Sequence, residues 1–250
     1  MYTQISSFKI NKVIFKTEKF NKNDELKIVQ ITDFHDNKRI NKAKMMKEIK
    51  ELNPDIIVLT GDIIDFKTED FTNTISLMKG LLKINSHVYF VEGNHELRNK
   101  KGQEFLSYIK KIGINIIDND CKKVIINGKH INICGVEFLL EKTDFEKAVS
   151  NIENDKYTIL LSHSPNRPLI YVDSRVDLIL SGHTHGGQVR LPVVGAIVAP
   201  GQGLFPKYDK GVYPLGNTTL YIDSGLGCSV QPIRFLNKVQ FSYIIVKGER

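Results

Sequence analysis

Five short apolar runs recur along the chain, and each is followed by a polar residue that can bind a metal. Runs of this length, flanked by glycine or polar residues, predict buried β-strands. The runs are Ile28–Ile31, Ile56–Leu59, Val88–Val91, Thr158–Leu161 and Leu178–Leu180. Because the parallel strands of an open sheet end along one edge, where ligands bind, we expect the residues that follow the runs to meet there.

Segments with a helical spacing of apolar residues separate the first three runs. Apolar positions between Ile40 and Leu52 follow a helical period, and Asn53-Pro54 ends that helix. Further helices are predicted over Phe71–Ile84 and Gln103–Ile112, the second ended by Gly113. This alternation of strands and helices predicts a parallel sheet in the first half of the chain.

The pattern changes after Ile114. Asn127-Gly128 lies between two β-branched runs and predicts a hairpin. Other strands are predicted at Phe8–Phe15, Thr218–Ile222 and Val239–Val246. This mixture predicts an α/β fold in which two mixed β-sheets pack face to face with helices outside. We expect one domain over residues 1–250, because no linker, low-complexity segment or repeat interrupts the pattern.

The chain is basic, because Lys and Arg exceed Asp and Glu by seven. Such an excess is often only a solvated surface, but it also suits anionic partners such as phosphate esters or an acidic membrane face. The lysines are scattered, which does not indicate nucleic acid as an obligate partner. No protein partner is predicted.

The cysteines and the apolar segments bear on the cellular compartment. Cys121, Cys134 and Cys228 are odd in number and form no C-x-x-C motif, so we expect free thiols rather than a disulfide or a cysteine-zinc site. The N-terminus has no signal-peptide pattern, and no apolar stretch approaches the roughly 18 residues that cross a membrane. These features predict a cytoplasmic protein, with peripheral membrane contact left open.

The polar residues at the run ends form a candidate metal site. Asp33 and His35 are two residues apart, as are His183 and His185, and alternate residues of an extended segment point the same way. A lone aspartate or histidine is more often a cap or a core residue, but here seven candidates recur at strand ends. They are Asp33, His35, Asp62, Asn94, His163, His183 and His185.

The chemistry of this set predicts the metal. Imidazole and oxygen ligands without sulfur favour Mn, Fe or Zn. Seven ligands exceed the need of one catalytic ion, so two ions sharing a carboxylate are expected. Paired ions can activate a hydroxide and stabilise both the attacking and the leaving oxygen of a phosphate ester.

The same residues resemble the calcineurin-like metallophosphoesterase superfamily. Its signature blocks are D-x-H, G-D-x-x-D, G-N-H-[DE], a lone H and G-H-x-H. The corresponding segments here occur in the family order. They are Asp33–His35, Gly61–Asp65, Gly93–Glu96, His163 and Gly182–His185.

The resemblance implies a four-layer α/β/β/α sandwich and a dinuclear centre, with manganese favoured. It implies that one metal is held by Asp33, His35 and His185. It implies that the other is held by Asn94, His163 and His183. Asp62 would bridge the two. His95 would protonate the leaving oxygen or stabilise the phosphate, and Glu96 would fix the orientation of neighbouring groups.

A narrower resemblance lies in Gly186–Gln188, Tyr221–Gly227 and Pro232–Phe235. These segments look like a bacterial subgroup of phosphodiesterases that often act at membranes, some of which hydrolyse UDP-diacylglucosamine. Arg98, Arg167 and Arg190 follow three of the metal blocks and could hold a phosphate or carboxylate, although an arginine in such a place is more often an ordinary surface residue.

The apolar segment Leu191–Pro200 follows the last metal block. It is expected to be either an exposed lip that meets lipid or a loop packed onto the core.

The sequence therefore predicts a dinuclear metal-dependent phosphoesterase, more a diesterase than a monoesterase, acting by a metal-activated hydroxide. The substrate would be a phosphate ester, lipid- or nucleotide-linked. One alternative is a manganese-dependent nuclease of the same superfamily, which the lack of a basic-aromatic groove disfavours. Another is a non-catalytic scaffold, which the complete ligand set disfavours.

Overall fold

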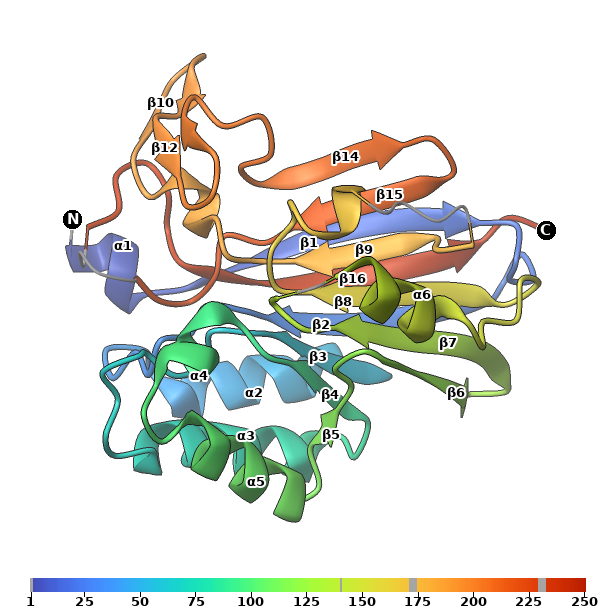
Figure 1. Cartoon of the computed structure of the whole chain (residues 1–250), viewed down its shortest axis with the longest axis horizontal. Coiled ribbons are helices and arrows are strands. Elements are labelled where there is room, and N and C mark those ends of the chain that lie inside the picture. The colour runs from blue at the N-terminus through green and yellow to red at the C-terminus, as the bar shows by residue number, and fades with distance from the viewer. Residues whose placement is uncertain (1, 140, 171–174, 229–232) are drawn as a thin grey trace.

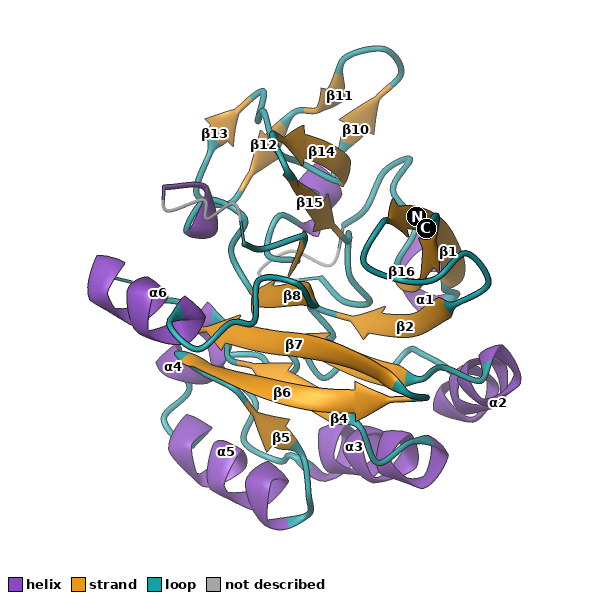
Figure 2. Ribbon diagram, turned by 90° about the vertical axis from the view of Figure 1, so that its right-hand side faces the viewer, coloured by secondary structure: helices purple, strands orange, loops and turns teal. Residues whose placement is uncertain are grey.

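Two six-stranded sheets pack face to face, and helices cover their outer faces (Figures 1 and 2). The computed structural model describes residues 2–139, 141–170, 175–228 and 233–250. Its layers confirm the predicted α/β/β/α sandwich.

The first sheet has the strand order β1-β16-β2-β3-β4-β5. Strands β2 to β5 are parallel, β16 runs antiparallel to β2, and β1 is parallel to β16. The bounds are β1 (Lys9–Thr17), β2 (Glu25–Ile31), β3 (Ile56–Thr60), β4 (Val88–Val91), β5 (Asn115–Ile116) and β16 (Gln240–Gly248).

The second sheet has the order β14-β15-β9-β8-β7-β6. Its four inner strands are parallel, and the edge strands β14 and β6 are antiparallel to their neighbours. The bounds are β6 (Asp120–Ile126), β7 (Lys129–Val136), β8 (Tyr157–Ser162), β9 (Leu178–Ser181), β14 (Gly211–Leu215) and β15 (Thr218–Ile222).

Helices α2 (Lys42–Leu52), α3 (Thr72–Ile84) and α5 (Gly102–Lys111) cover the first sheet, within two residues of their predicted bounds. The side chain of Asn41 accepts the Lys44 N–H at the start of α2, and Asn53 ends this helix in the left-handed region. Helix α6 (Lys142–Val149), which the pattern did not predict, covers the second sheet.

The strands read as continuous apolar runs because both faces of each sheet are buried. In β2, Ile28 belongs to the core between the sheets, whereas its neighbour Val29 packs in the core under the helices. Leu160 and Leu161 of β8 divide in the same way between the outer core and the inner core. The carboxyl ends of β2, β3, β4, β8 and β9 therefore carry their polar residues out of two apolar layers at one place.

The hairpin between β6 and β7 corrects the expectation for the cysteines. Asn127 and Gly128 both have positive φ and form the two-residue turn. Counting outwards from that turn brings Cys121 opposite Cys134, and these two residues form a disulfide with Cα atoms 3.9 Å apart. The expectation of free thiols was wrong for this pair because it ignored the hairpin register. Cys228 is free.

Two short ribbons project from the carboxyl-end side of the second sheet (upper left in Figure 1). One pairs β10 (Arg190–Leu191) with β11 (Gly195–Ala196), and the other pairs β12 (Val198–Ala199) with β13 (Gly203–Leu204). The short helices are α1 (Tyr2–Ser6), α4 (Asn94–Arg98), η1 (Pro168–Ile170) and η2 (His185–Gly187). None of the helices within the described ranges is long and apolar enough to span a membrane.

Candidate metal centre

The chain turns sharply where each of three strands delivers its ligands. After β2, β3 and β9, the residues Asp33, His35, Asp62, His183 and His185 all adopt positive φ, between 47° and 69°. Side chains other than glycine rarely adopt this region, and each such residue costs about 1–3 kcal/mol. Local strain is therefore concentrated at the candidate metal ligands, where the surrounding packing must hold it.

The first group of side chains consists of Asp33, His35 and His185, which all lie buried. Nε2 of His35 lies 3.2 Å from Nε2 of His185, and Asp33 Oδ1 lies 3.5 Å from the latter atom. The His183 N–H donates to Asp33 Oδ2 at 3.0 Å, which fixes the carboxylate. These three side chains converge closely enough to hold one metal ion.

The second group consists of Asp62, His163 and His183. Nε2 of His163 lies 3.1 Å from Asp62 Oδ2 and 3.1 Å from Nδ1 of His183. The other ring nitrogen of His163 lies 2.8 Å from the Thr60 carbonyl oxygen. A carbonyl can only accept, so Nδ1 carries the proton and Nε2 keeps a lone pair for a metal.

Asp62 lies between the two groups. Its Oδ2 atom is 3.1 Å from His163 Nε2 and 3.8 Å from His35 Nε2. Its Oδ1 atom accepts the backbone N–H of His95 at 2.8 Å. This carboxylate is the group within reach of both clusters.

Asn94 supplies a test of whether the pocket suits a metal. Its Oδ1 atom is buried and has no hydrogen-bond partner among the described residues. Leaving a buried acceptor unsatisfied costs about 1–3 kcal/mol. A divalent ion beside Asn94 would satisfy this oxygen, so the donor set fits metal ions.

Charge in the cluster depends on which groups are protonated. Burial lowers the pKa of His183 to about 3, so this ring is neutral and can offer a lone pair. Burial would also lower the pKa of His163, but the nearby Asp62 carboxylate raises it to about 9. A proton on His163 and a divalent cation compete for the same position, so metal binding would release that proton.

His95 faces the same centre from α4. Its Nε2 atom lies 3.9 Å from Asp62 Oδ2, and its Nδ1 atom lies 3.3 Å from Asp65 Oδ2. Burial would lower the pKa of His95, but the Asp65 hydrogen bond and the neighbouring carboxylates outweigh that effect and raise it. The raised pKa favours the protonated ring. The Phe66 N–H also points at Nδ1, at 3.1 Å.

Glu96 links the turn after β3 to the turn after β4 through hydrogen bonds. Its buried carboxylate accepts the backbone N–H groups of Asp62 at 2.9 Å, Ile63 at 2.8 Å and Gly93 at 2.8 Å. At Gly93, a Cβ atom would lie 2.2 Å from Asp62 Oδ1, so only glycine allows this approach. The β3 and β4 turns are thus held in one arrangement, in agreement with the expected orienting role of Glu96.

A cavity of about 460 Å³, here called the His95 cavity, opens over the cluster. Arg98 lines it, but Arg167 and Arg190 are not among its described lining residues. Arg167 stacks over the Phe138 ring at 5.6 Å, and Arg190 forms an ion pair with Asp209 at 2.5 Å. The described lining residues are Asp62, Phe66, Asn94, His95, Arg98, Phe138, His183, His185, Pro200 and Gly201.

The sequence reasoning missed two functional neighbours. Asp65 contacts both His95 and His35, at 3.3 and 3.7 Å. It is the final aspartate of the G-D-x-x-D block, and that motif position could have identified it. Arg234 is fully buried, donates to the Ser224 and Gly227 carbonyl oxygens, and approaches His185 Nδ1 at 3.3 Å. No local pattern identifies Arg234, because its partners come from the other segments of the narrower resemblance. Pro232 of that resemblance lies outside the described residues.

Several known proteins are similar to this chain in sequence. The chain is 33% identical over 232 residues to an uncharacterized metallophosphoesterase of Bacillus subtilis, YkuE, covering 90% of this chain and 80% of that protein. It is 31% identical to an uncharacterized metallophosphoesterase of Helicobacter pylori, covering 97% of this chain and 65% of that protein. It is 27% identical to a Bos taurus transmembrane protein with a metallophosphoesterase domain, covering 90% of this chain and 54% of that protein.

Among solved structures, the 5'-nucleotidase precursor from Thermus thermophilus superposes with a TM-score of 0.55 at 12% identity. That match covers 90% of this chain and 54% of the other, and it shows a shared fold. The family model for calcineurin-like phosphoesterases matches residues 26–187, the segment that contains every candidate ligand. The chain therefore belongs to the calcineurin-like phosphoesterase family, whose members are metal-dependent phosphoric ester hydrolases with a dinuclear divalent centre.

Proposed function

We propose that this chain hydrolyses phosphodiesters with two divalent metal ions, manganese being preferred. The observation that carries this proposal is the place of Asp62, whose Oδ2 atom is within 4 Å of a histidine from each ligand group. The first ion would be held by Asp33, His35 and His185. The second would be held by Asn94, His163 and His183. Asp62 would be shared, and bound ions would supply Lewis-acid polarisation of the phosphoryl group and a hydroxide nucleophile.

In this proposal His95 acts on the leaving group. Its Nε2 atom faces the candidate metal centre, and Asp65 on the other side of the ring raises its pKa and so favours the protonated form. A proton delivered from Nε2 to the leaving oxygen prevents the departure of an unstable alkoxide. Glu96 and Asp65 position the ring and the two turns and do not touch the reacting atoms.

The diester preference rests on charge. A monoester carries two negative charges near neutral pH, whereas a diester carries one. Apart from the proposed proton donor His95, Arg98 is the one cationic side chain in the described lining of the His95 cavity, and it is exposed to solvent. With little positive charge beyond the metals, the pocket suits the singly charged ester better.

An assay of two aryl esters tests this function. We expect bis(4-nitrophenyl) phosphate to be hydrolysed faster than 4-nitrophenyl phosphate with Mn²⁺, and neither to be hydrolysed with EDTA. Asp62→Ala serves as the inactive control. Faster turnover of the monoester, or greater turnover with Zn²⁺ or Fe²⁺, would refute the respective preference. Turnover of neither ester would favour the scaffold alternative, and nicking of plasmid DNA would favour a nuclease.

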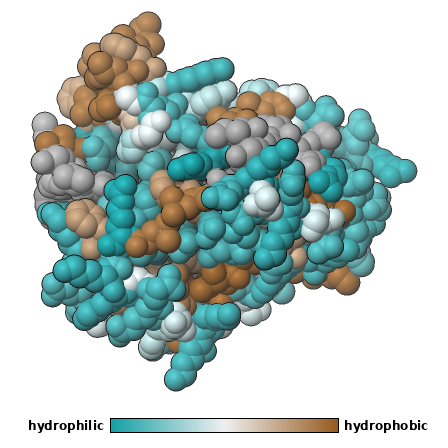
Figure 3. Space-filling view, in the orientation of Figure 1, coloured by the Kyte–Doolittle hydropathy of each residue, from teal (hydrophilic) through white to brown (hydrophobic). Residues whose placement is uncertain are grey.

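We further propose that the protein contacts an anionic membrane surface through an apolar lobe, defined as residues 189–206 and 233–236. Its exposed apolar side chains gather at the upper left of Figure 3. Val193 is fully exposed, and Leu204 and Phe205 are 70% and 67% exposed. The other exposed apolar side chains of the lobe are Leu191, Val194, Val198, Ile233, Phe235 and Leu236.

The parts of the lobe form one unit beside the metal centre. The Arg190 N–H donates to the Phe235 carbonyl oxygen at 3.1 Å, and the Phe205 N–H donates to the Ile197 carbonyl oxygen at 2.9 Å. Pro200 and Gly201 of the lobe line the His95 cavity. The nearest charged residues along the chain include Lys207, and residues 189–206 contain no Asp or Glu. An apolar, acid-free surface next to lysines suits an anionic bilayer.

Vesicle co-sedimentation tests this contact. We expect binding to phosphatidylglycerol-containing vesicles and weaker binding to pure phosphatidylcholine. The double variant Val193→Ser/Phe205→Ser should lose binding, whereas Ile125→Ser, which removes a 61% exposed side chain on β6, should not. Equal binding by the double variant would refute the proposal. So would light scattering that finds the wild type dimeric and the double variant monomeric, because a second copy would then cover the lobe.

A further inference from the structure

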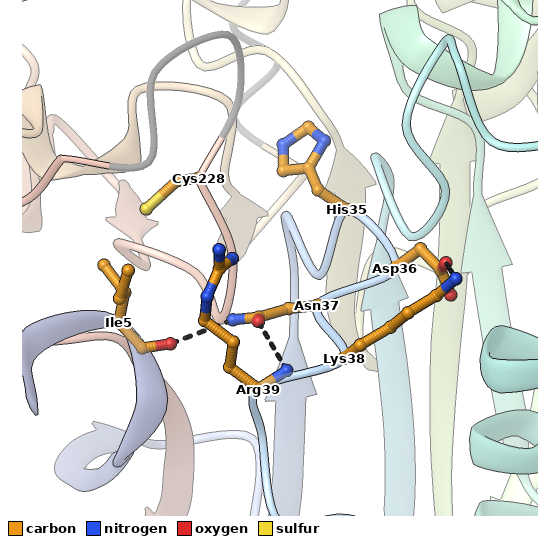
Figure 4. A pocket seen from close by; sticks show the side chains of 7 residues that line it. All are labelled: Ile5, His35, Asp36, Asn37, Lys38, Arg39 and Cys228. Atoms are coloured by element: carbon orange, nitrogen blue, oxygen red, sulfur yellow. Dashed lines mark hydrogen bonds and ion pairs between the residues drawn. The ribbon is translucent and has the colours of Figure 1, made fainter. Parts of the chain in front are cut away.

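A second cavity, of about 430 Å³, adjoins the metal centre (Figure 4). We call it the Arg39 cavity. His35 lines it, whereas His185, whose Nε2 atom is 3.2 Å from that of His35, lines the His95 cavity. One cavity therefore lies beside each of these two candidate ligands. The described lining residues of the Arg39 cavity are Ile5, His35, Asp36, Asn37, Lys38, Arg39 and Cys228.

Arg39 presents a cation to this cavity. Its guanidinium extends between Ile5 and Cys228, and it has no hydrogen-bond or ion-pair partner within the described parts of the chain (Figure 4). Its backbone is fixed, because the Arg39 N–H donates to Asn37 Oδ1 at 3.1 Å. Asn37 in turn donates to the carbonyl oxygens of Ile5 at 3.1 Å and Leu226 at 2.8 Å. These hydrogen bonds hold the backbone of the loop, whereas the Arg39 guanidinium has no partner among the residues that the structure describes.

The acid in the same cavity does not neutralise Arg39. Asp36 Oδ1 accepts from Asn73 Nδ2 at 2.9 Å and from Thr74 Oγ1 at 2.9 Å, so it is committed to α3. Asp36 Oδ2 lies 3.7 Å from Lys38 Nζ. Among the described residues, Arg39 is thus left without a compensating acid. A guanidinium fork is the side chain best suited to hold a phosphate through two hydrogen bonds.

We propose that the Arg39 cavity is a second substrate subsite, which binds a further phosphate group on the substituent opposite the leaving group. This inference rests on the proposed phosphodiesterase function and deepens it. The phosphorus of a diester has two substituents, and a centre with a cavity beside each of two of its histidines would accommodate one substituent toward each cavity. The leaving group lies in the His95 cavity near its acid, and the retained substituent lies in the Arg39 cavity. The preferred substrates are therefore phosphodiesters that carry a second phosphate.

A matched pair of substrates tests the subsite. Thymidine 5'-(4-nitrophenyl phosphate) is compared with the same compound bearing a 3'-phosphate. In Arg39→Ala we expect kcat/KM to fall about tenfold or more for the 3'-phosphorylated ester, the size of one lost charge-assisted hydrogen bond. For the other ester we expect a change below about twofold, since the lost contact is absent there.

Two further variants control this comparison. Arg39→Lys keeps the charge and should restore part of the discrimination. Arg250→Ala removes an arginine at the C-terminus, at the other end of the molecule in Figure 1, and should change neither ester. Equal effects of Arg39→Ala on both esters, or no effect on either, would overturn the subsite.

A binding measurement without turnover separates this inference from the proposed function. Cys228 is the free cysteine and lines the cavity, so its alkylation by N-ethylmaleimide reports on occupancy. In EDTA-treated protein, thymidine 3',5'-bisphosphate should slow alkylation several-fold in the wild type and not in Arg39→Ala, whereas thymidine should slow neither. Equal protection in both proteins, or none in the wild type, would refute the subsite. Failure to hydrolyse any phosphodiester would instead refute the function.

Discussion

Asp65 Oδ2 lies 3.3 Å from Nδ1 of His95, on the side of the ring away from Asp62. The same oxygen lies 3.7 Å from Nδ1 of His35. Asp65 therefore contacts both the proposed proton donor and a proposed metal ligand, and it couples the two through one carboxylate. Groups of this kind orient the residues that they touch and set their protonation.

Asp65→Asn should lower kcat about 10–100-fold with little change in KM and with both metals retained. The reason is that the loss falls on the orientation and proton affinity of His95. His95→Ala should also lower kcat while leaving the metals bound. In a double-mutant cycle, Asp65→Asn should add little in the His95→Ala background, because the two residues act as a unit. Additive losses would show that Asp65 acts through another group.

Removing the shared carboxylate should disturb both metals. Asp62→Ala should reduce the metal content from two ions per chain to one or fewer, since its Oδ2 atom is within reach of both ligand groups. Elemental analysis after gel filtration measures this content. Asp155→Ala, which changes an exposed aspartate, is the matched control. Two retained ions in Asp62→Ala would exclude a bridging role.

The stability of the fold should depend on pH through Asp118, a half-buried carboxyl outside the ligand set. Burial raises the pKa of Asp118 from 3.8 to about 7, and burial together with Asp118 raises that of Glu92 to about 8. Because the pKa of Asp118 is higher in the folded than in the unfolded state, the contribution of this group to stability is fully present below its unfolded pKa. That stability is lost as the pH rises through the folded value, here between roughly pH 4 and pH 7.

Asp118→Asn keeps an oxygen for the Glu92 N–H, which Asp118 accepts at 3.1 Å, but it removes the charge. It should raise Tm at pH 8, by about 2–4 °C for each kcal/mol recovered, and change it less at pH 5. Thermal unfolding monitored by circular dichroism in EDTA at both pH values measures the effect. An equal shift at pH 5 and pH 8 would contradict a charge-based cause.

The disulfide between Cys121 and Cys134 should be detectable by thiol titration. Denatured, unreduced protein should react at one thiol, and reduced protein at three. Reduction should also lower Tm, because closing a loop of this size contributes about 3 kcal/mol. Cys228→Ser should leave the effect of reduction unchanged. Three reactive thiols in the unreduced protein would return the pair to the free state that the sequence suggested.

Much of the fold could be predicted from local patterns. Apolar runs predicted five strands, and helical spacing placed α2, α3 and α5 within two residues. The Asn127-Gly128 turn predicted the β6–β7 hairpin. Helix α6 was missed because neighbouring lysines and acids blur its apolar face, which consists of Phe145, Ala148 and Val149. The elements that were predicted depend on interactions among residues close in sequence, and such interactions can be recognised in the sequence itself.

The residue types of the candidate site could be predicted from the sequence, but the contacts and the exposure of those residues could not. The strand ends supply the residue types of a dinuclear centre, and the structure brings them together from β2, β3, β8, β9 and α4. Only the tertiary structure reveals that Arg190 is paired with Asp209 and that the lobe around Val193 is exposed. The exposure of an apolar segment depends on what packs over it, and the sequence of that segment does not contain this information.

The sequence by itself determined the family, the layers of the sandwich and the identity of the candidate ligands. The tertiary structure decided which of them face one another, as His35 and His185 do across 150 residues of sequence, and that a different cavity lies beside each of these two histidines. The physical reason is the range of the forces involved. Strand and helix propensities act over a few residues, whereas the contacts at the centre arise only when two sheets pack and bring distant strand ends to one edge.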